Sequence, residues 1–144
     1  MTQVDFYILD NDSEDARLRL ACRIVDKATQ QDQHVFVNST SDGEAQKLDE
    51  LLWTFSQGSF IPHKIVRDAV ETAPREPVVI GLHQQPVGER WQLLINLAAD
   101  VPDFFSRYER VAEVVDGNAV RREQSRERYR FYRDRGYKLN THQV

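Results

Sequence analysis

Apolar and polar positions in the first half of the chain alternate between a strand pattern and a helical pattern. A short apolar run over residues 4–9 predicts a buried strand, and the polar residues 10–13 that follow are typical of a helix start. Helical spacing then predicts a first helix ending near Gln31, with one apolar face made of Leu18, Ala21, Cys22, Val25 and Ala28. Residues 34–37 predict a second buried strand.

The next segment predicts a second helix. Ser41 and Glu44 form a capping-box sequence, in which each side chain can bond the backbone of the other at a helix start. Four apolar residues then share one helical face: Ala45, Leu48, Leu52 and Phe55. The sequence 57–63 (Gln-Gly-Ser-Phe-Ile-Pro-His) ends this helix, because glycine and proline interrupt regular structure. The first half therefore predicts the order β-α-β-α.

The second half predicts three more strands, a short helical turn and a long final helix. The strands are expected at residues 77–81, 92–97 and 110–115, with a polar connection over 82–90 and a helical turn at Phe104-Phe105. Strands that alternate with helices favour a mostly parallel sheet covered on both faces. We expect one α/β domain over residues 1–144, with about five strands flanked by helices.

This fold class often binds nucleotides through a glycine-rich loop with a characteristic spacing of glycines. The six glycines build neither the dinucleotide pattern GxGxxG nor the phosphate-loop pattern GxxxxGK[ST]. The first predicted strand also ends in acidic residues, where a phosphate would need glycine and free backbone N–H groups. The sequence therefore predicts a nucleotide-binding-like fold without a phosphate loop.

Composition excludes several classes of protein. A chain of 144 residues can bury one core, and no apolar run approaches the roughly 18 residues that cross a bilayer. The N-terminus lacks the features of a signal peptide, so we expect a cytoplasmic protein. Cys22 is the only cysteine, which excludes an intrachain disulfide. The four histidines show no metal-ligand spacing, and we expect no metal or other cofactor: His34, His63, His83 and His142.

Charge is distributed unevenly along the chain. Residues 119–138 contain eight basic residues and three acids, about +5, whereas the whole chain is at −4, which leaves about −9 for the rest. On a helical period one face of this segment carries Arg122, Arg126, Tyr129, Arg130 and Arg133. Arginine binds carboxylates in bidentate pairs, and tyrosine offers an apolar wall, so the face suits an anionic ligand. The alternatives are a solvated helix and a nucleic-acid surface.

Two other sets of residues have both a functional and a structural interpretation. Asp10 and Asp12 could serve as nucleophile and general acid beside Mg²⁺ in a phosphohydrolase, with supporting groups at Asn38-Ser39-Thr40, Lys64, Asp100 and Asp103. The simpler interpretation is that Asn11, Asp12 and Ser13 cap the first helix. Trp53 and Phe60 flank a helix end and a turn, where they either pack in the core or form a patch that binds a partner.

Several separated motifs resemble one known family. The segments that carry the resemblance are residues 126–133 (RERYRFYR) with 136–141 (GYKLNT), 5–7 (DFY), 48–53 (LDELLW), 59–63 (SFIPH) and 105–116. Together they closely resemble the chi subunit of bacterial DNA polymerase III over essentially the whole length. Residues 64–75 and 82–90 are the least distinctive part.

The resemblance implies a non-catalytic accessory subunit of the clamp loader, with an α/β fold that lacks a nucleotide site. It implies binding to the acidic C-terminal tail of single-stranded DNA-binding protein and, through another surface, to the small psi subunit; in some bacteria a helicase-like partner uses that second surface. Matched motif by motif, the tail site falls on Val115, Arg122, Arg126, Tyr129 and Arg130. The psi-binding patch includes Trp53 and Phe60.

We therefore expect a replication adaptor that contacts DNA only indirectly. Two alternatives of other classes stay open on the sequence alone. One is the Mg²⁺-dependent phosphohydrolase that uses Asp10 and Asp12, and the other is direct nucleic-acid binding by the C-terminal basic helix.

Overall fold

A seven-stranded parallel sheet forms the centre of the protein in the computed structural model, which describes residues 1–54, 60–67, 74–82, 88 and 92–144. The strand order across the sheet is β3-β4-β2-β5-β6-β1-β7. The strands are β1 (Gln3–Ile8), β2 (Val35–Ser39), β3 (His63–Val66), β4 (Val78–Leu82), β5 (Leu93–Asn96), β6 (Arg110–Val115) and β7 (Lys138–Gln143). All strand pairs are parallel, which confirms the predicted fold class.

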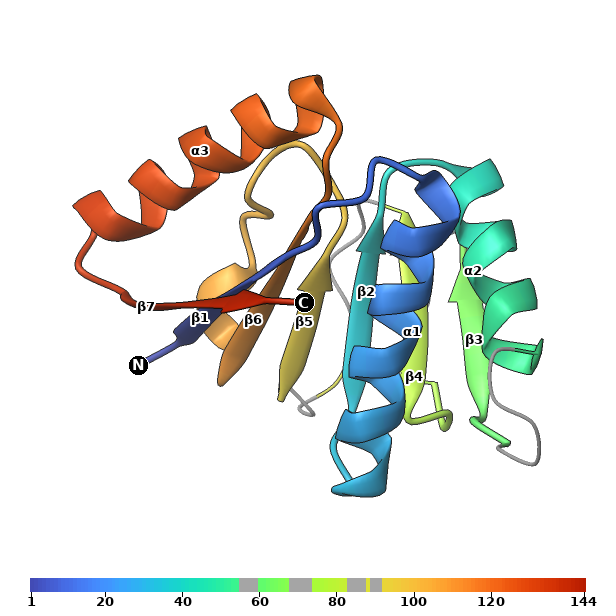
Figure 1. Cartoon of the computed structure of the whole chain (residues 1–144). Helices are drawn as coiled ribbons and strands as arrows, with labels where there is room; N and C mark the ends of the chain where they lie inside the picture. Colours follow the sequence, from blue (N-terminus) through green and yellow to red (C-terminus); the bar gives the residue numbers. More distant parts are fainter. Residues whose placement is uncertain (55–59, 68–73, 83–87, 89–91) are drawn as a thin grey trace.

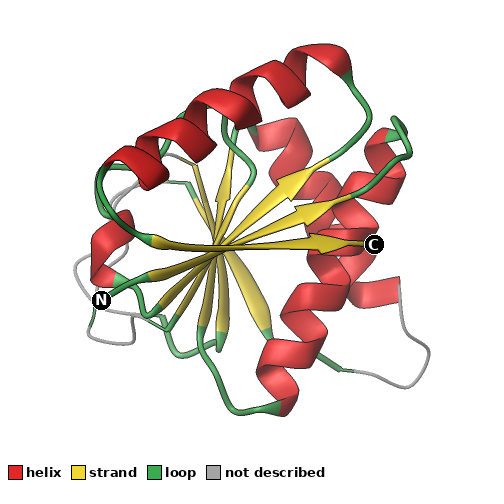
Figure 2. Ribbon diagram, turned by 60° about the vertical axis from the view of Figure 1, so that its left-hand side comes forward, coloured by secondary structure: helices red, strands yellow, loops and turns green. Residues whose placement is uncertain are grey.

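Helices cover both faces of this sheet. The described helices are α1 (Glu14–Gln30), α2 (Asp42–Thr54), the short 3-10 helix η1 (Phe105–Arg107) and α3 (Ala119–Asp134). Helices α1 and α2 lie on one face, whereas α3 lies across the other, over β6, β1 and β7 (Figures 1 and 2). The layers are therefore those of an α/β sandwich, in which α3 shares its face of the sheet with η1, whose Phe105 packs on Phe131 and Tyr132 of α3.

The core divides into two clusters because parallel strands buried on both faces are apolar on both sides. On the α1–α2 face, Leu18, Val25 and Leu48 pack against strand residues that include Val37 and Ile80. On the α3 face, the second cluster is largely aromatic and comprises Phe6, Phe36, Phe104, Phe105, Tyr108 and Tyr132 with neighbouring aliphatic residues. The aromatic cluster is the platform on which α3 sits.

Capping residues fix where the helices begin. The Ser13 hydroxyl accepts a hydrogen bond from the Ala16 N–H at the start of α1, which confirms the predicted cap. The Asn118 side chain accepts from the Arg121 N–H in the same way and starts α3 directly after β6. Helix α3 ends at Asp134, and Gly136 two residues later has a φ of +80°, in the left-handed region that favours glycine.

The capping box at α2 differs from its prediction in one bond. The Ser41 hydroxyl accepts from the Glu44 N–H as expected (3.2 Å). The Glu44 carboxylate accepts instead from Thr40 N–H (3.0 Å) and from the Arg17 guanidinium (2.7 Å). The burial of Glu44 raises its pKa, but these bonds outweigh the burial and hold that pKa below its ordinary value.

The prediction of about five strands misses two, which both lie at edges of the sheet. Strand β3 contains the polar residues His63 and Lys64, and β7 is polar throughout except for Leu139, so neither shows a buried-strand pattern. Some predicted features lie outside the described residues: Phe55 on the face of α2, the turn at 57–59, His83 and most of the connection 82–90. Within the residues that the structure describes, no helix is long and apolar enough to cross a membrane.

Candidate functional site

A small pocket opens between α3 and the carboxyl ends of β1, β6 and β7. It encloses about 220 Å³ and is lined by Phe6, Ile8, Val115, Arg122, Ser125, Arg126, Tyr129 and Thr141. Ligand sites for small molecules usually measure roughly 300–1,000 Å³, so this pocket has room for one side chain rather than a nucleotide. We call it the α3 pocket.

The apolar wall of the α3 pocket consists of Val115 and the Tyr129 ring. Val115 is the last residue of β6 and is buried, while Tyr129 on α3 is 37% exposed. The Tyr129 ring packs edge-on against Phe6, with 5.2 Å between ring centroids. Phe6 belongs to the buried aromatic cluster, so the position of the Tyr129 ring is set by the core.

The two arginines of the pocket are held differently. The Arg126 side chain is 65% exposed and pairs with Glu123 one turn earlier, at 3.1 Å between Nη1 and Oε2. An exposed pair of this kind contributes little to stability, so a ligand carboxylate can replace Glu123 at low cost. Arg122 is fixed more firmly, because its Nε donates to the Asp116 carbonyl oxygen at 3.0 Å and its Nη2 lies 3.5 Å from Asp10 Oδ1.

Three other arginines of the basic segment do not line this pocket: Arg130, Arg133 and Arg135. Arg130 is exposed on α3 and does not line the pocket. Arg133 is exposed and contacts its neighbour Asp134, and Arg135 lies over the Phe131 ring with 3.6 Å from its Cζ to the ring centroid. Arg126 and Arg122 therefore supply the cationic wall of the pocket itself.

Two residues of the basic segment point into the protein instead of toward a ligand. Arg128 and Tyr132 are buried, and both donate to the fully buried carboxylate of Glu113 on β6: Arg128 Nε at 2.9 Å and Tyr132 OH at 2.7 Å. Asn96 at the end of β5 donates to the same carboxylate from Nδ2 at 3.1 Å. Burial and the Glu113 carboxylate raise the pKa of Tyr132, so its hydroxyl stays a donor.

The surplus of arginine on α3 is therefore smaller than the sequence suggests. The count of about +5 for residues 119–138 includes only the acids within that segment, but Arg121 and Arg128 pair with acids elsewhere, Asp116 and Glu113. The Arg121 Nε donates to Asp116 Oδ1 at 2.9 Å, and its Nη1 lies 3.5 Å from Glu14. Burial raises the pKa of Asp116, but the Arg121 guanidinium outweighs it and lowers that pKa below its ordinary value.

The acidic loop after β1 adopts a capping geometry. The Asn11 Oδ1 accepts from the Ser13 N–H at 2.8 Å, and the Asp10 side chain is 97% exposed. Gly117 donates its N–H to the Asn11 carbonyl oxygen at 2.9 Å, and a Cβ at Gly117 would lie 2.7 Å from the Asp10 carbonyl oxygen. The close approach of these two loops places the start of α3 beside the end of β1.

The groups that would support a phosphohydrolase are occupied elsewhere or lie apart from this loop. Asn38 is buried and donates to Asn96 Oδ1 at 3.1 Å, while the Ser39 hydroxyl donates to Glu44 at 2.8 Å. Lys64 lies on β3 at the opposite end of the sheet order from β1. Within the residues that the structure describes, there is no group of three or more His, Cys, Asp or Glu side chains that could hold a metal ion.

Cys22, His63 and His142 make contacts that serve the fold. Cys22 is fully buried in the α1 face, and burial raises the pKa of its thiol to about 12, so it is a core residue as expected. His142 on β7 stacks on Tyr7 at 4.8 Å between centroids and bonds Asp5. His63 lies beside Asp49, 3.0 Å from Nε2 to Oδ1.

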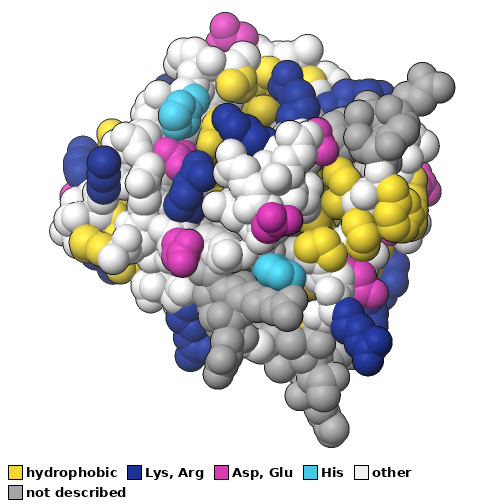
Figure 3. Space-filling model, turned by 90° about the horizontal axis from the view of Figure 1, so that it is seen from below, with side chains coloured by type: hydrophobic (Ala, Val, Ile, Leu, Met, Phe, Trp, Pro, Cys, Tyr) yellow, Lys and Arg dark blue, Asp and Glu magenta, His cyan; other side chains and the backbone are white. Residues whose placement is uncertain are grey.

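Trp53 and Phe60 form an exposed aromatic pair at the other end of the molecule. Their side chains are 51% and 70% exposed, and their ring centroids lie 5.4 Å apart; Trp53 also packs on His63 at 4.6 Å. A patch of apolar side chains gathers on the right of the view from below, the side on which α2 and β3 lie (Figure 3). The sequence allows either core packing or an exposed patch for these two rings, and their exposure shows that the core interpretation is wrong. We call them the Trp53–Phe60 patch.

Sequence reasoning misses four residues that line the α3 pocket. Ser125 lies on α3 and donates its hydroxyl to the Arg122 carbonyl oxygen at 2.7 Å. Phe6 and Ile8 of β1 and Thr141 of β7 come from strands that are far apart in the sequence but pair in register, Phe6 beside Thr141. Strand alternation would place Phe6 and Ile8 on one face, but only the pairing of β1 with β7 brings Thr141 there.

The fold and the site together define the class of the protein. It is a parallel α/β domain with a small pocket beside α3 that is lined by aromatic and guanidinium groups. A solved structure with a similar fold, "The crystal structure of T4 UvsW", has a TM-score of 0.70 and 8% sequence identity. The match covers 99% of this chain and 41% of the UvsW chain, and it shows a similar fold alone.

Comparison with family models and curated relatives is more specific. The family model "DNA polymerase III chi subunit, HolC" matches residues 1–140. Relatives named "DNA polymerase III subunit chi" are 38% identical in Pseudomonas aeruginosa (100% of this chain, 98% of that protein) and 31% identical in Escherichia coli (98% and 97%). The chain belongs to the DNA polymerase III chi family, whose members are replication accessory subunits without catalytic activity of their own.

Proposed function

We propose that the chain is an adaptor that connects DNA polymerase III to the acidic C-terminal tail of single-stranded DNA-binding protein. The α3 pocket is the observation that carries this proposal. It combines an apolar wall (Val115 and Tyr129) with an exposed guanidinium (Arg126) in a volume that fits one side chain. A peptide that ends in an apolar residue presents both groups at once, an apolar side chain and a terminal carboxylate.

We assign a role to each pocket residue from its exposure and contacts. Arg126 grips the terminal carboxylate, because its guanidinium is exposed and is held only by a surface pair with Glu123. Val115 and the Tyr129 ring contact the last side chain of the tail. Arg122 and Arg130 form a basic rim for the carboxylates further up the tail.

The second partner surface of the proposal is the Trp53–Phe60 patch. Exposed aromatic side chains that pack on each other are typical anchors at protein interfaces, because they bury much apolar area at little cost in conformational entropy. We assign this patch to the psi subunit of the clamp loader, or to a helicase-like protein that uses the same surface. The chi family belongs to the replication machinery of bacteria, so we place the protein in the cytoplasm.

Family membership replaces the phosphohydrolase alternative, since a chi subunit has no catalytic activity of its own. Direct nucleic-acid binding by α3 is the remaining alternative. It is weakened by the structure of α3, where Arg121 and Arg128 are paired with Asp116 and Glu113 and therefore cannot contact phosphates freely.

The experiment that tests the proposal compares two ligands for the intact protein. A labelled acidic peptide with an apolar C-terminal residue and a labelled oligo-dT of similar charge are titrated at moderate salt and followed by fluorescence anisotropy. We expect the peptide to bind and the oligonucleotide to bind more weakly. An oligonucleotide that binds more tightly than the peptide would contradict the adaptor proposal and favour a nucleic-acid surface.

A further inference from the structure

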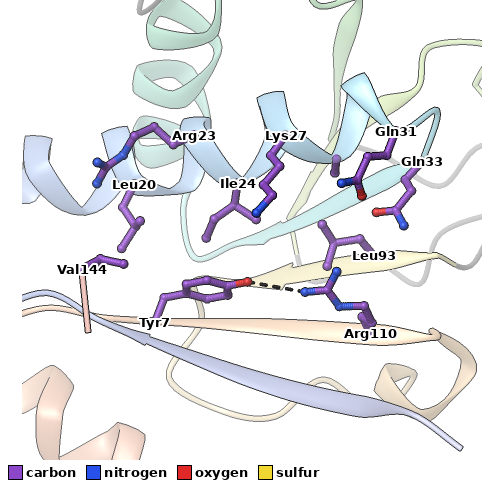
Figure 4. Close-up of a pocket in the computed structure, with 11 residues that line it drawn as sticks. Tyr7, Leu20, Arg23, Ile24, Lys27, Gln31, Gln33, Leu93, Arg110 and Val144 are labelled. Carbon is purple, nitrogen blue, oxygen red and sulfur yellow. Dashed lines mark hydrogen bonds between the residues drawn. The ribbon is translucent and has the colours of Figure 1, made fainter. Parts of the chain in front are cut away.

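A second groove lies on the opposite face of the sheet, between α1 and strands β1 and β6. Its volume is about 380 Å³. The described side chains that line it include Arg23 and Lys27 from α1 and Tyr7 and Arg110 from the strands, and no Asp or Glu is among them (Figure 4). We call it the α1 groove. In a chain with a net charge of −4, a groove lined by three cations and no acid is selectively cationic.

The α1 groove is separate from both surfaces described above. Phe6 lines the α3 pocket, while its neighbour Tyr7 lines the α1 groove, and successive side chains of a strand point to opposite faces. The Trp53–Phe60 patch belongs to α2 and the segment before β3, which lie at the far end of the sheet from β1. The α1 groove therefore shares no lining residue with the α3 pocket, and neither Trp53 nor Phe60 lines it.

The cations of the groove differ in how far they are neutralised. Arg110 is held by Asp5, with Nη2 2.9 Å from Oδ2, and its Nη2 also lies 3.5 Å from the Tyr7 hydroxyl. Arg23 and Lys27 are exposed and make neither a hydrogen bond nor an ion pair with any other residue that the structure describes. These two side chains supply the net positive charge that an anionic ligand would meet.

Apart from Gln31 and Gln33, the other residues that line the groove are apolar. Its floor includes Leu20, Ile24 and Leu93, together with the Tyr7 ring. Sites for single-stranded nucleic acid stack successive bases on several aromatic side chains. One tyrosine, whose hydroxyl lies against Arg110, does not provide such a platform. An aliphatic floor beside two free cations instead matches a peptide that carries aliphatic and acidic side chains.

The spacing of the cations indicates how such a peptide would lie. Arg23 and Lys27 are four residues apart on α1, which places them about 5–6 Å from each other along the helix. In an extended segment, side chains two residues apart lie about 6–7 Å apart and point to the same side. Two acidic residues at that spacing can each meet one cation, while the alternate side chains face the floor.

We propose that the α1 groove binds an acidic and aliphatic peptide segment of a protein partner, in extended conformation alongside α1. Carboxylates of the segment pair with Arg23 and Lys27, and its aliphatic side chains cover Ile24 and Leu93. The proposal is independent of the tail site, because no residue of the α3 pocket takes part in it.

Selection from a library of short random peptides tests the proposal, carried out on the Arg126→Ala variant so that binding to the α3 pocket is reduced. We expect peptides that carry two acidic residues and aliphatic residues, and we expect their affinity, measured with synthetic copies, to fall about tenfold or more when Arg23→Glu and Lys27→Glu are added. The exposed cations Lys47 and Lys64 provide a matched control, since their double change to Glu alters net charge equally and should leave binding unchanged.

Three outcomes would overturn the proposal. The first is a selection in which no peptide depends on Arg23 and Lys27, and the second is an equal loss in the control variant. The third is an oligo-dT that binds wild type through Arg23 and Lys27 more tightly than the selected peptides, which would make the groove a nucleic-acid site. Amide shifts in the NMR spectrum of the labelled protein identify the face that each ligand contacts, and α1 and β1 should respond to the peptide.

Discussion

Arg128 of α3 donates its Nε–H to the buried carboxylate of Glu113 on β6, at 2.9 Å between Nε and Oε1. This bond joins the basic helix to the centre of the sheet, and Tyr132 and Asn96 complete the set of donors around Glu113. The α3 pocket lies between the same helix and strands β1, β6 and β7. The Arg128–Glu113 hydrogen bond therefore holds α3, and with it the proposed tail site, in place, although neither residue lines the pocket.

Removing Arg128 should destabilise the protein without a direct effect on ligands. Arg128→Ala leaves the Glu113 carboxylate buried with one charge partner missing, which typically costs about 3–5 kcal/mol. Urea unfolding measures this loss. Arg126→Ala is the matched control, because Arg126 is exposed, and its cost should stay within about 0.5 kcal/mol. Equal stabilities for the two variants would contradict the role of Arg128.

Acid should remove part of the stability that Asp116 contributes. The pKa of Asp116 in the folded protein is lowered below the ordinary value of 3.8, despite burial, chiefly by the Arg121 guanidinium. A carboxyl group whose pKa is depressed by folding stabilises the protein above its unfolded pKa and loses that effect as the pH falls through the folded value.

Asp116→Asn tests this dependence. The difference in unfolding free energy between wild type and variant should be largest near neutral pH and should shrink as the pH falls below about 3.8. Chemical unfolding at a series of pH values measures it. A difference that stays constant across the acid range would show that Asp116 acts by packing and not by its charge.

Much of the fold follows from the sequence because buried parallel strands are apolar on both faces. Residues 78–82 and 93–96 are recognisable for this reason. Strand β7 is not, since Lys138–Gln143 is polar, and its place in the sheet depends on backbone pairing with β1. An edge strand can be polar because one side of its backbone and much of its surface face water.

The candidate site also has features that the sequence predicts and features that it does not. The helical period correctly places Arg122, Arg126 and Tyr129 together, but it does not reveal that Arg128 points inward. Ser125, Arg128 and Tyr132 follow the inward spacing i, i+3, i+7, although two of them are polar. Glu113 within an apolar strand is the available signal, because a buried acid requires a donor. The identity of that donor depends on how α3 packs on β6.

Phe60→Ala should abolish binding to psi while leaving the fold intact. The Phe60 ring is 70% exposed, so its removal should cost no more than about 1 kcal/mol of stability. Phe105→Ala is the contrasting control, because Phe105 is buried in the aromatic cluster, where such a change typically costs about 3–5 kcal/mol. Co-purification with psi and thermal unfolding measure the two effects. Retained psi binding by Phe60→Ala would remove this residue from the proposed interface.

Arg130→Ala should change the kinetics of tail binding more than its final affinity. Arg130 is exposed beyond the α3 pocket, so its charge acts mainly on the approach of an acidic peptide. The association rate should fall and its dependence on salt should weaken, while dissociation stays nearly unchanged. Stopped-flow fluorescence at several salt concentrations measures these rates. A variant whose defect lies in dissociation alone would place Arg130 in direct contact with the tail.

The most direct test of the adaptor account is the affinity of Arg126→Ala for a peptide that copies the acidic tail of single-stranded DNA-binding protein. Calorimetry at moderate salt should show a loss of about 2–5 kcal/mol, because the terminal carboxylate would lose its guanidinium partner. Arg133→Ala is the matched control, since Arg133 is exposed on the same helix but does not line the pocket, and it should bind almost as wild type does. Wild-type affinity in a folded Arg126→Ala variant would contradict the assignment of the α3 pocket as the tail site.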